Sequence, residues 1–187
     1  MLGAHPKRRA FCDIKVGFTQ GSVRLKLQTA TADDVTDLVS LRNAVNEHLR
    51  SQYGDGYWLA RSTERGALFG MRRGTVYLAR YRGKLIATLT LSTRKPWAID
   101  KKYFHASEKP LYLTAMAVHP DYQRKGIGRS SIDEARRLAI AWPGDAIRLD
   151  AYDTAAGAGD FYRKCGFREV GRAVYRVAPL IYFEMLL

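Results

Sequence analysis

One stretch of the sequence decides how the chain folds: Val118-His-Pro-Asp-Tyr-Gln-Arg-Lys-Gly-Ile-Gly-Arg-Ser130. Pro120 ends a strand, because it has no N–H for the ladder and holds the preceding residue extended. Gly126 and Gly128 let the backbone turn tightly and approach a bulky group with no side chain between them. The helix predicted to follow begins with unpaired N–H groups and the positive end of its dipole. Three cations flank the glycines: Arg124, Lys125 and Arg129. The stretch therefore predicts an anion site.

Two common phosphate-binding loops do not fit this stretch. A Walker loop needs Lys followed by Ser or Thr directly after its last glycine, whereas Arg129-Ser130 stands here. A dinucleotide-binding loop needs a third glycine or alanine at position 131, which is Ser131. A bare Gly-x-Gly pair is also typical of a simple tight turn. The function of the turn therefore depends on the elements around it.

Helical and extended patterns alternate on both sides of the stretch. Residues 111–118 are mostly apolar, as in a strand covered on both faces, and a helix is predicted over about 126–142. Residues 1–22 show no periodicity and are interpreted as an N-terminal arm. Residues 23–187 are predicted to form one α/β domain around a mixed sheet. Its other strands are predicted at about 23–27, 76–79, 85–89, 146–151, 168–176 and 180–187, and its other helices at about 32–49, 63–71 and 155–164.

The composition limits the class of protein. With 187 residues, 47% hydrophobic and 26% charged, the chain suits one soluble domain with one core. Cys12 and Cys165 have no partner at metal-ligand spacing, so no metal site is predicted. No apolar run approaches the ~18 residues that span a bilayer, and no secretory signal is readable, so we expect a cytoplasmic protein.

The charge balance is strongly basic, with 31 Lys and Arg against 18 Asp and Glu, a net charge of +13. Such an excess attracts nucleic acid, anionic membrane, an acidic protein partner or a phosphate-rich cofactor, and it also suits a solvated surface with no partner. The chain has no helix-turn-helix, zinc-finger or RNP pattern, so a nucleic-acid-binding module is the weaker interpretation.

Two motifs resemble those of a known family and stand in the same order. Residues 113–129 resemble the strand-loop-helix signature of the GNAT superfamily of N-acetyltransferases, whose loop reads Arg/Gln-x-x-Gly-x-Gly/Ala. Residues 161–167, Phe-Tyr-Arg-Lys-Cys-Gly-Phe, resemble its second signature, and Tyr162 follows Gly128 by 34 residues. The resemblance spans about nine-tenths of the chain and leaves out residues 1–22. It implies a GNAT-like single domain: a mixed central sheet with a splayed strand pair that binds acetyl-CoA, flanked by about four helices.

The resemblance also implies the reaction and the residues that perform it. An acetyl group would pass from acetyl-CoA to an amine, either of a small molecule or of a protein N-terminus or lysine, by direct attack on the thioester. The backbone of Met116, Ala117 and Val118 would pair with the pantetheine arm, and the Val118 N–H would hold the thioester oxygen. Tyr162 would be the acid that protonates the leaving thiolate. The pyrophosphate would lie on the loop and helix start, at Gln123, Arg124, Lys125, Gly126, Ile127, Gly128, Arg129 and Ser130.

The acceptor amine and the general base stay unassigned. The family often has Asn where this chain has Ala155, and His119 is interpreted as a turn residue rather than a base. Two aromatic segments, 53–58 and 97–104, are expected to border the acceptor. The main alternative is a domain that binds coenzyme A for regulation without turnover. A homodimer is compatible with the resemblance.

Overall fold

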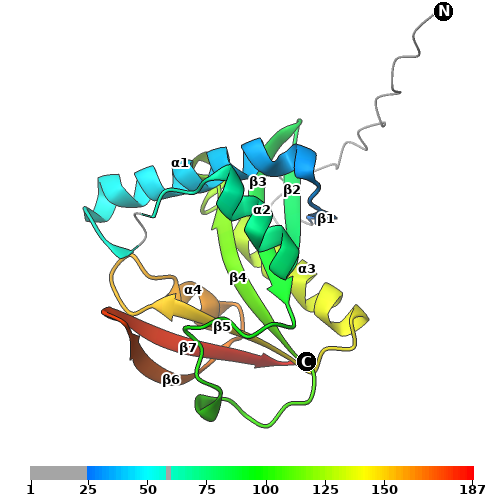
Figure 1. Cartoon of the computed structure of the whole chain (residues 1–187), viewed down its shortest axis with the longest axis vertical. Coiled ribbons are helices and arrows are strands. Elements are labelled where there is room, and N and C mark those ends of the chain that lie inside the picture. Colours follow the sequence, from blue (N-terminus) through cyan, green and yellow to red (C-terminus); the bar gives the residue numbers. More distant parts are fainter. Residues whose placement is uncertain (1–24, 58–59) are drawn as a thin grey trace, which may run out of the picture.

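The computed structural model describes residues 25–57 and 60–187, so the N-terminal arm predicted over 1–22 lies outside the described residues. One mixed seven-stranded sheet runs in the order β1-β2-β3-β4-β5-β7-β6 (Figure 1). Its strands are β1 (Gln28–Thr29), β2 (Thr75–Tyr81), β3 (Lys84–Ser92), β4 (Pro110–Val118), β5 (Ala146–Tyr152), β6 (Arg168–Tyr175) and β7 (Ala178–Leu186). The helices are α1 (Val35–Tyr53), α2 (Glu64–Arg73), α3 (Ile127–Ala141) and α4 (Gly159–Lys164), with 3₁₀ turns at Ala32–Asp34, Lys101–Tyr103 and Pro120–Tyr122. The predicted mixed α/β domain with about four helices is confirmed.

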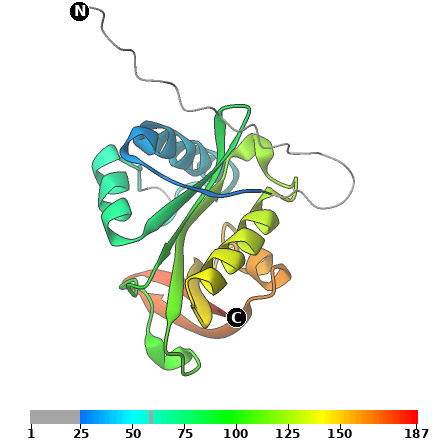
Figure 2. The same ribbon diagram turned by 90° about the vertical axis from the view of Figure 1, so that its right-hand side faces the viewer.

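Two pairs of helices cover the two faces of the sheet. α1 and α2 lie on one face and α3 and α4 on the other, as the side view shows (Figure 2). α3 turns its apolar stripe to the sheet, where Ile127, Ile132 and Ala135 are buried. These side chains pack with inward residues of β3, β4 and β5 in the main core, which holds the loop between β4 and α3 against the middle of the sheet.

β4 and β5 run parallel and separate soon after they begin. Their pairing extends only from Pro110–Ala146 to Tyr112–Arg148, although β4 continues to Val118. On its other edge β4 stays paired with β3 as far as Val118. One edge of β4 is therefore open over its second half, and the predicted splayed strand pair is confirmed.

A β-bulge in β4 lies where the gap opens. Thr88 pairs with Ala117 and Thr90 with Thr114, so β4 has one more residue than β3 between these two pairs. Ala115 lies in this interval with φ 49°, a left-handed conformation that is uncommon for a residue other than glycine. Because a bulge bends its strand and increases its twist, this one turns the last residues of β4 away from β5.

Two predicted elements differ from the structure. A strand was predicted at 23–27, but residues 25–27 are not in a strand and β1 begins at Gln28; the Leu25 N–H donates to Ser130 Oγ at 2.9 Å rather than to a neighbouring strand. Leu25 and Leu27 are nevertheless buried, so the alternation of apolar residues that suggested a strand comes from side-chain packing and not from hydrogen bonding between strands. Residues 23 and 24 lie outside the described residues.

The helix predicted at 155–164 begins at Gly159. The Gly157 N–H closes a turn on the Thr154 carbonyl at 2.8 Å, and a Cβ on Gly157 would collide with the Tyr152 carbonyl oxygen. Only a glycine fits this close approach. The glycines therefore make a tight connection from β5 to a short helix, and the helical pattern upstream of residue 159 was misleading.

Candidate active site

A cleft of about 540 Å³ opens where β4 and β5 diverge. It is bounded by the end of β4, the loop that follows, the start of α3, α4 and the second half of α1. The cleft thus brings both sequence motifs into one cavity. The lining residues are Val45, Leu49, Met116, Ala117, Val118, Gln123, Arg124, Gly126, Gly128, Arg129, Ala156, Ala158, Phe161 and Tyr162.

The loop from β4 to α3 forms a cradle of backbone N–H groups. The 3₁₀ turn Pro120–Tyr122 is capped by His119, whose Nδ1 accepts the Asp121 N–H at 3.3 Å. Arg124 and Gly126 then adopt left-handed conformations, with φ 59° and 79°. The first bond within α3 runs from the Ser130 N–H to the Gly126 carbonyl at 3.0 Å. The N–H groups of residues 127–129 precede that bond, so they point out of the helix start, where its dipole attracts an anion.

Gly128 brings the two motifs into contact. A Cβ on Gly128 would lie 3.1 Å from two carbon atoms of the Phe161 ring on α4. Arg129 supports the same junction, because its guanidinium donates to the Lys164 carbonyl at the end of α4. The loop glycine therefore fixes how closely α3 approaches α4, and with it the position of the residue next to Phe161.

The open edge of β4 carries the N–H of Val118. The His119 N–H donates to Ile86 of β3 at 2.8 Å, and Val118 lies opposite Ala87. Successive residues of an antiparallel ladder point their backbone groups to opposite edges, so the Val118 N–H points away from β3 and into the gap. Its carbonyl points the same way and accepts a hydrogen bond from Gln123 Nε2 at 3.0 Å.

Tyr162 lies at the inner end of the cleft. The residue is 8% exposed, and its ring packs between Phe161, Phe167 and Phe183. The hydroxyl reaches β4, where it donates to Met116 Sδ at 4.0 Å. Burial, with the negative charge of Asp150, raises the pKa of the Tyr162 phenol. The phenol is therefore protonated at neutral pH and can give a proton but not take one.

Three of the residues predicted to bind the pyrophosphate have side chains that serve the fold. Ile127 is fully buried in the main core. Ser130 is also buried, and its hydroxyl accepts the Leu25 N–H. Lys125 Nζ donates to the Asp121 carbonyl at 2.8 Å and thereby braces the loop. In the described part of the chain, these three do not line the cleft, whereas the other predicted site residues do.

Five cleft residues were not predicted from the sequence. Val45 and Leu49 belong to the apolar stripe of α1, and that pattern does not distinguish a helix face that packs on a core from one that borders a cavity. The other three come from α4 and the turn before it; they are Ala156, Ala158 and Phe161.

The two aromatic segments expected near the acceptor lie in different places. Tyr57 stacks on Tyr152 at the end of β5 and donates to the Val177 carbonyl at 2.7 Å, so it joins the α1–α2 connection to the β6–β7 hairpin. Residue 58 lies outside the described residues. The 97–104 segment packs instead on Tyr182 of β7, whose hydroxyl donates to the Ala98 carbonyl at 2.5 Å. The segment does not line the cleft, and its expected place beside the acceptor stays a prediction.

Two other titratable groups have shifted pKa values. Burial and the charge of Lys84 lower the pKa of His119, whose ring already caps a turn, as predicted. Burial raises the pKa of the Cys165 thiol, which disfavours the nucleophilic thiolate. Across residues 25–57 and 60–187, three or more His, Cys, Asp and Glu side chains nowhere converge as metal ligands. No helix in the same ranges is long and apolar enough to cross a bilayer.

Comparison with known proteins agrees with this geometry. The model of the acetyltransferase (GNAT) family matches residues 38–167. The glucosamine 6-phosphate N-acetyltransferase of Schizosaccharomyces pombe is 30% identical over 73 residues, which are 39% of this chain and 63% of that protein. The chain thus aligns with less than two thirds of the length of that relative.

Solved structures share the fold at low sequence identity. A GCN5-related N-acetyltransferase from Rhodopseudomonas palustris superimposes with a TM-score of 0.67 at 18% identity, covering 90% of this chain and 99% of that one. The ribosomal-protein-S18-alanine N-acetyltransferase of Escherichia coli gives 0.64 at 15% identity, with 87% and 93% covered. Taken with the splayed strands and the two motifs that meet at Gly128, the family match shows that this chain belongs to the GNAT family of acetyltransferases.

Proposed function

We propose that the chain transfers the acetyl group of acetyl-CoA to an amine, which attacks the thioester directly in the cleft between β4 and β5. The observation that carries this proposal is that one cavity holds an anion cradle, an inward-pointing backbone N–H at Val118 and the protonated phenol of Tyr162. These three groups match the three parts of the donor that need recognition: the pyrophosphate, the thioester oxygen and the sulfur.

The residues present fit the donor. The N–H groups of residues 127–129, with the left-handed turn at Arg124 and Gly126, would hold the pyrophosphate. The open edge of Met116, Ala117 and Val118 would pair with the pantetheine arm as an added strand does. When bound, acetyl-CoA supplies an activated acetyl group. The chain binds it, orients it and keeps it among apolar side chains of α1 and α4.

Val118 and Tyr162 would act on opposite ends of the reacting thioester. The Val118 N–H would donate to the carbonyl oxygen as negative charge develops there, a contribution that is large in a site with little water. Tyr162 would give its proton to the departing sulfur, and its raised pKa keeps that proton available at neutral pH. Binding the amine beside the thioester makes the attack effectively intramolecular.

The acceptor is tested by screening amines with acetyl-CoA and following free thiol. The panel should include glucosamine 6-phosphate and peptides with an N-terminal alanine, because the matched relatives bear the names of enzymes for these substrates. Spermidine and free amino acids complete it. We expect thiol release that depends on both the protein and one class of amine. If the protein binds acetyl-CoA and no amine accelerates thiol release, the alternative of a coenzyme A-binding domain without turnover is favoured.

A further inference from the structure

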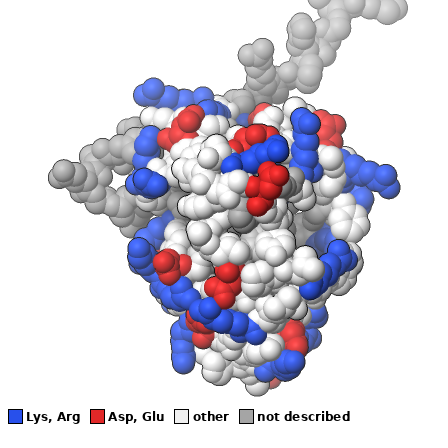
Figure 3. Space-filling view, turned by 90° about the vertical axis from the view of Figure 1, so that its left-hand side faces the viewer, with Lys and Arg blue, Asp and Glu red and all other residues white. Residues whose placement is uncertain are grey.

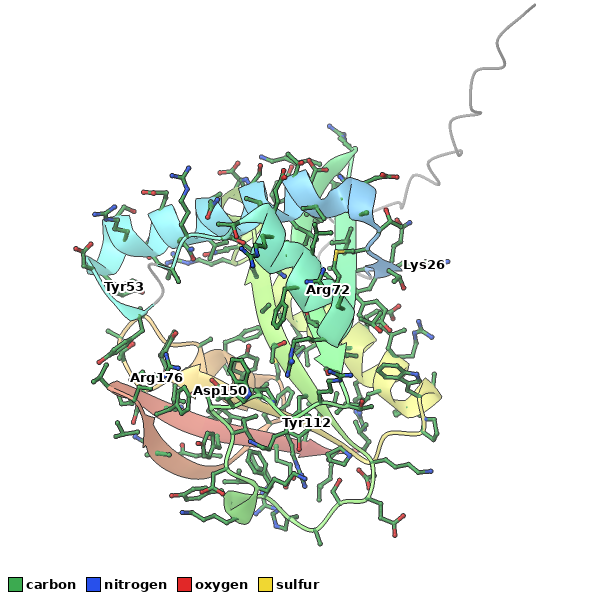
Figure 4. The ribbon with its side chains drawn as sticks, in the orientation of Figure 1. Lys26, Tyr53, Arg72, Tyr112, Asp150 and Arg176 are labelled. Carbon is green, nitrogen blue, oxygen red and sulfur yellow. The ribbon has the colours of Figure 1, made fainter. Side chains whose placement is uncertain are left out.

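Asp150 lies on β5 just beyond the point where the two central strands separate. The last β4–β5 pair is Tyr112–Arg148, and Asp150 is two residues further along β5 on the same face as Arg148. The alternate residues of β5 point to the opposite face, since Ile147, Leu149 and Ala151 belong to the main core under α3. Asp150 therefore lies on the α1 side of the gap, and Figure 4 shows it beside β7, below α1.

The Asp150 carboxylate accepts a hydrogen bond from its own backbone N–H. It has no side-chain partner in the described part of the chain. In the same part of the chain, every other carboxylate that is at least partly buried is satisfied. The pairs are Asp34 with Arg80, Glu134 with Arg137, Asp145 with Ser107 and two backbone N–H groups, Asp153 with Arg172, and Glu184 with Arg148. A half-buried carboxylate without a side-chain partner calls for an explanation in a chain of net charge +13.

The groups around Asp150 do not neutralise it. Tyr182 lies opposite it on β7 and Tyr152 follows it on β5. Burial raises the pKa of both phenols and of Tyr162 on α4, and the negative charge of Asp150 raises each of them further. Arg148, on the same face of β5, forms a buried ion pair with Glu184 at 2.9 Å, and His105 Nδ1 contacts the same carboxylate at 2.6 Å. From β4, the adjacent Tyr112 has a buried hydroxyl without a hydrogen-bond partner in the described chain.

We propose that Asp150 is the acceptor-side carboxylate of this active site, which binds the ammonium group of the acceptor and then takes its proton. This inference rests on the proposed acetyl transfer. It restricts the acceptor to aliphatic amines that are cationic in neutral solution, and it excludes aryl amines and hydroxyl compounds as good substrates. The ammonium group of the acceptor would supply the positive charge that the half-buried Asp150 carboxylate lacks.

In the proposed reaction, Asp150 takes a proton on the α1 side of the gap, and Tyr162 gives a proton on the other side. On the α1 side, an N–H bond of the ammonium breaks and an O–H bond forms on Asp150, which frees the nitrogen lone pair. The lone pair forms the C–N bond to the acetyl carbon, and the C–S bond breaks with its electrons on sulfur. On the other side, sulfur takes the proton of Tyr162, which regains one from the second N–H through water. Asp150 releases its proton to solvent.

Desolvation favours the first of these steps. Burial raises the pKa of the Asp150 carboxyl, so the folded protein already disfavours its negative charge. Moving a proton from an ammonium to such a carboxylate turns a desolvated ion pair into two neutral groups. General base catalysis of this kind is worth about 10²–10⁴ in rate.

The first test needs no turnover. Carboxyl carbon NMR of protein labelled at aspartate, with free coenzyme A bound, should contain one resonance that titrates above the ordinary aspartate range and is missing from Asp150→Asn. Adding n-butylammonium should lower that midpoint, because a bound cation stabilises the carboxylate, whereas the neutral n-butanol should leave it unchanged. An Asp150 resonance that does not respond to n-butylammonium overturns the inference.

The second test is the pH profile of thiol release with the fastest amine of the panel. Asp150→Asn should lower kcat/KM at pH 7 about 100-fold or more. The difference in kcat/KM between the variant and wild type should become smaller as the pH approaches the pKa of the amine, because the neutral amine needs no base. Asp150→Glu should restore part of the rate. Asp160→Asn, which removes an exposed carboxylate that pairs with Arg163, is the matched control and should keep wild-type kinetics.

The outcomes separate the two proposals. If wild type releases thiol with a panel amine and Asp150→Asn matches it at pH 7, the inference is wrong while the acetyl transfer stands. If wild type is inactive with every amine, the proposed acetyl transfer fails, and the NMR titration still decides whether Asp150 binds an ammonium group.

Discussion

Among single residues, the two loop glycines are needed for different physical reasons. Gly126 has φ 79°, which a residue with a side chain adopts only with strain. Gly128 is limited by space, because a Cβ there would lie 3.1 Å from two carbon atoms of the Phe161 ring, which is tighter than an ordinary contact. The sequence predicted that both glycines matter. It could not predict the contact with Phe161, because that residue reaches Gly128 only through the packing of α4 on α3.

Gly128→Val should weaken acetyl-CoA binding about tenfold or more, because the added side chain pushes Phe161 and α4 away from the cradle. Isothermal titration calorimetry measures the change in Kd. Gly70→Ala is the matched control, since a Cβ there meets no atom within 4 Å. It should leave Kd unchanged and stabilise α2 by up to about 1 kcal/mol. Equal affinities for Gly128→Val and wild type would contradict the placement of the cradle.

Tyr162→Phe should lower kcat about 100-fold and leave the Kd of acetyl-CoA near the wild-type value, because only the proton donor is removed. The fold should tolerate the change, since the hydroxyl makes only a weak contact with Met116 Sδ at 4.0 Å. Stopped-flow thiol detection and calorimetry measure the two quantities. Tyr175→Phe on β6 serves as the control. A Tyr162→Phe enzyme as fast as wild type would show that another group protonates the sulfur.

Asp150 should also make the stability of the unliganded protein depend on pH. Its folded pKa is raised above the unfolded value, so its contribution is fully present below the unfolded pKa, near 3.8, and is lost as pH rises through the folded pKa. Asp150→Asn carries no charge to lose, so its Tm should exceed that of wild type at pH 8 and equal it near pH 4. Each unit of pKa elevation corresponds to about 1.4 kcal/mol. A Tm difference independent of pH, measured by calorimetry, would mean that the carboxyl titrates normally.

Among the secondary-structure elements, sequence patterns predicted which ones exist better than where they end. The apolar run of β4 and the stripe of α3 were both readable, because burial repeats with the period of each element. The bulge at Ala115 was not readable, since alanine carries no local signal for a left-handed conformation. Likewise, the alternation of Leu25 and Leu27 gave no sign that a serine on α3 would take the place of a neighbouring strand.

Ser130→Ala tests this last contact, because the sequence placed Ser130 at the pyrophosphate and the structure places its hydroxyl on Leu25. Leaving the Leu25 N–H without its buried acceptor should lower the free energy of unfolding by about 1–3 kcal/mol. The Kd of acetyl-CoA should change less than twofold, since the cradle N–H groups are untouched. Urea unfolding and calorimetry measure the two. A large loss of affinity with unchanged stability would return Ser130 to the cofactor site.

For the whole molecule, the basic charge has a simple use. Figure 3 shows Lys and Arg spread around a central strip of uncharged residues, with Asp and Glu between them. Such a surface attracts a donor that carries several phosphate charges, and the attraction falls as salt is added. The net charge of +13 therefore needs no nucleic-acid partner, although it leaves an acidic acceptor protein open.

Acetyl transfer to an amine is tested most directly with acetyl-CoA labelled with ¹³C in the acetyl group. Protein, donor and the amine panel are incubated together, and mass spectrometry follows the amines and the intact protein while thiol release is recorded. Direct attack predicts label in one class of amine, in equal amount to the thiol released, and no acetyl group left on the protein. Binding of the donor without label in any amine, or label that accumulates on the protein before it reaches the amine, would contradict the account.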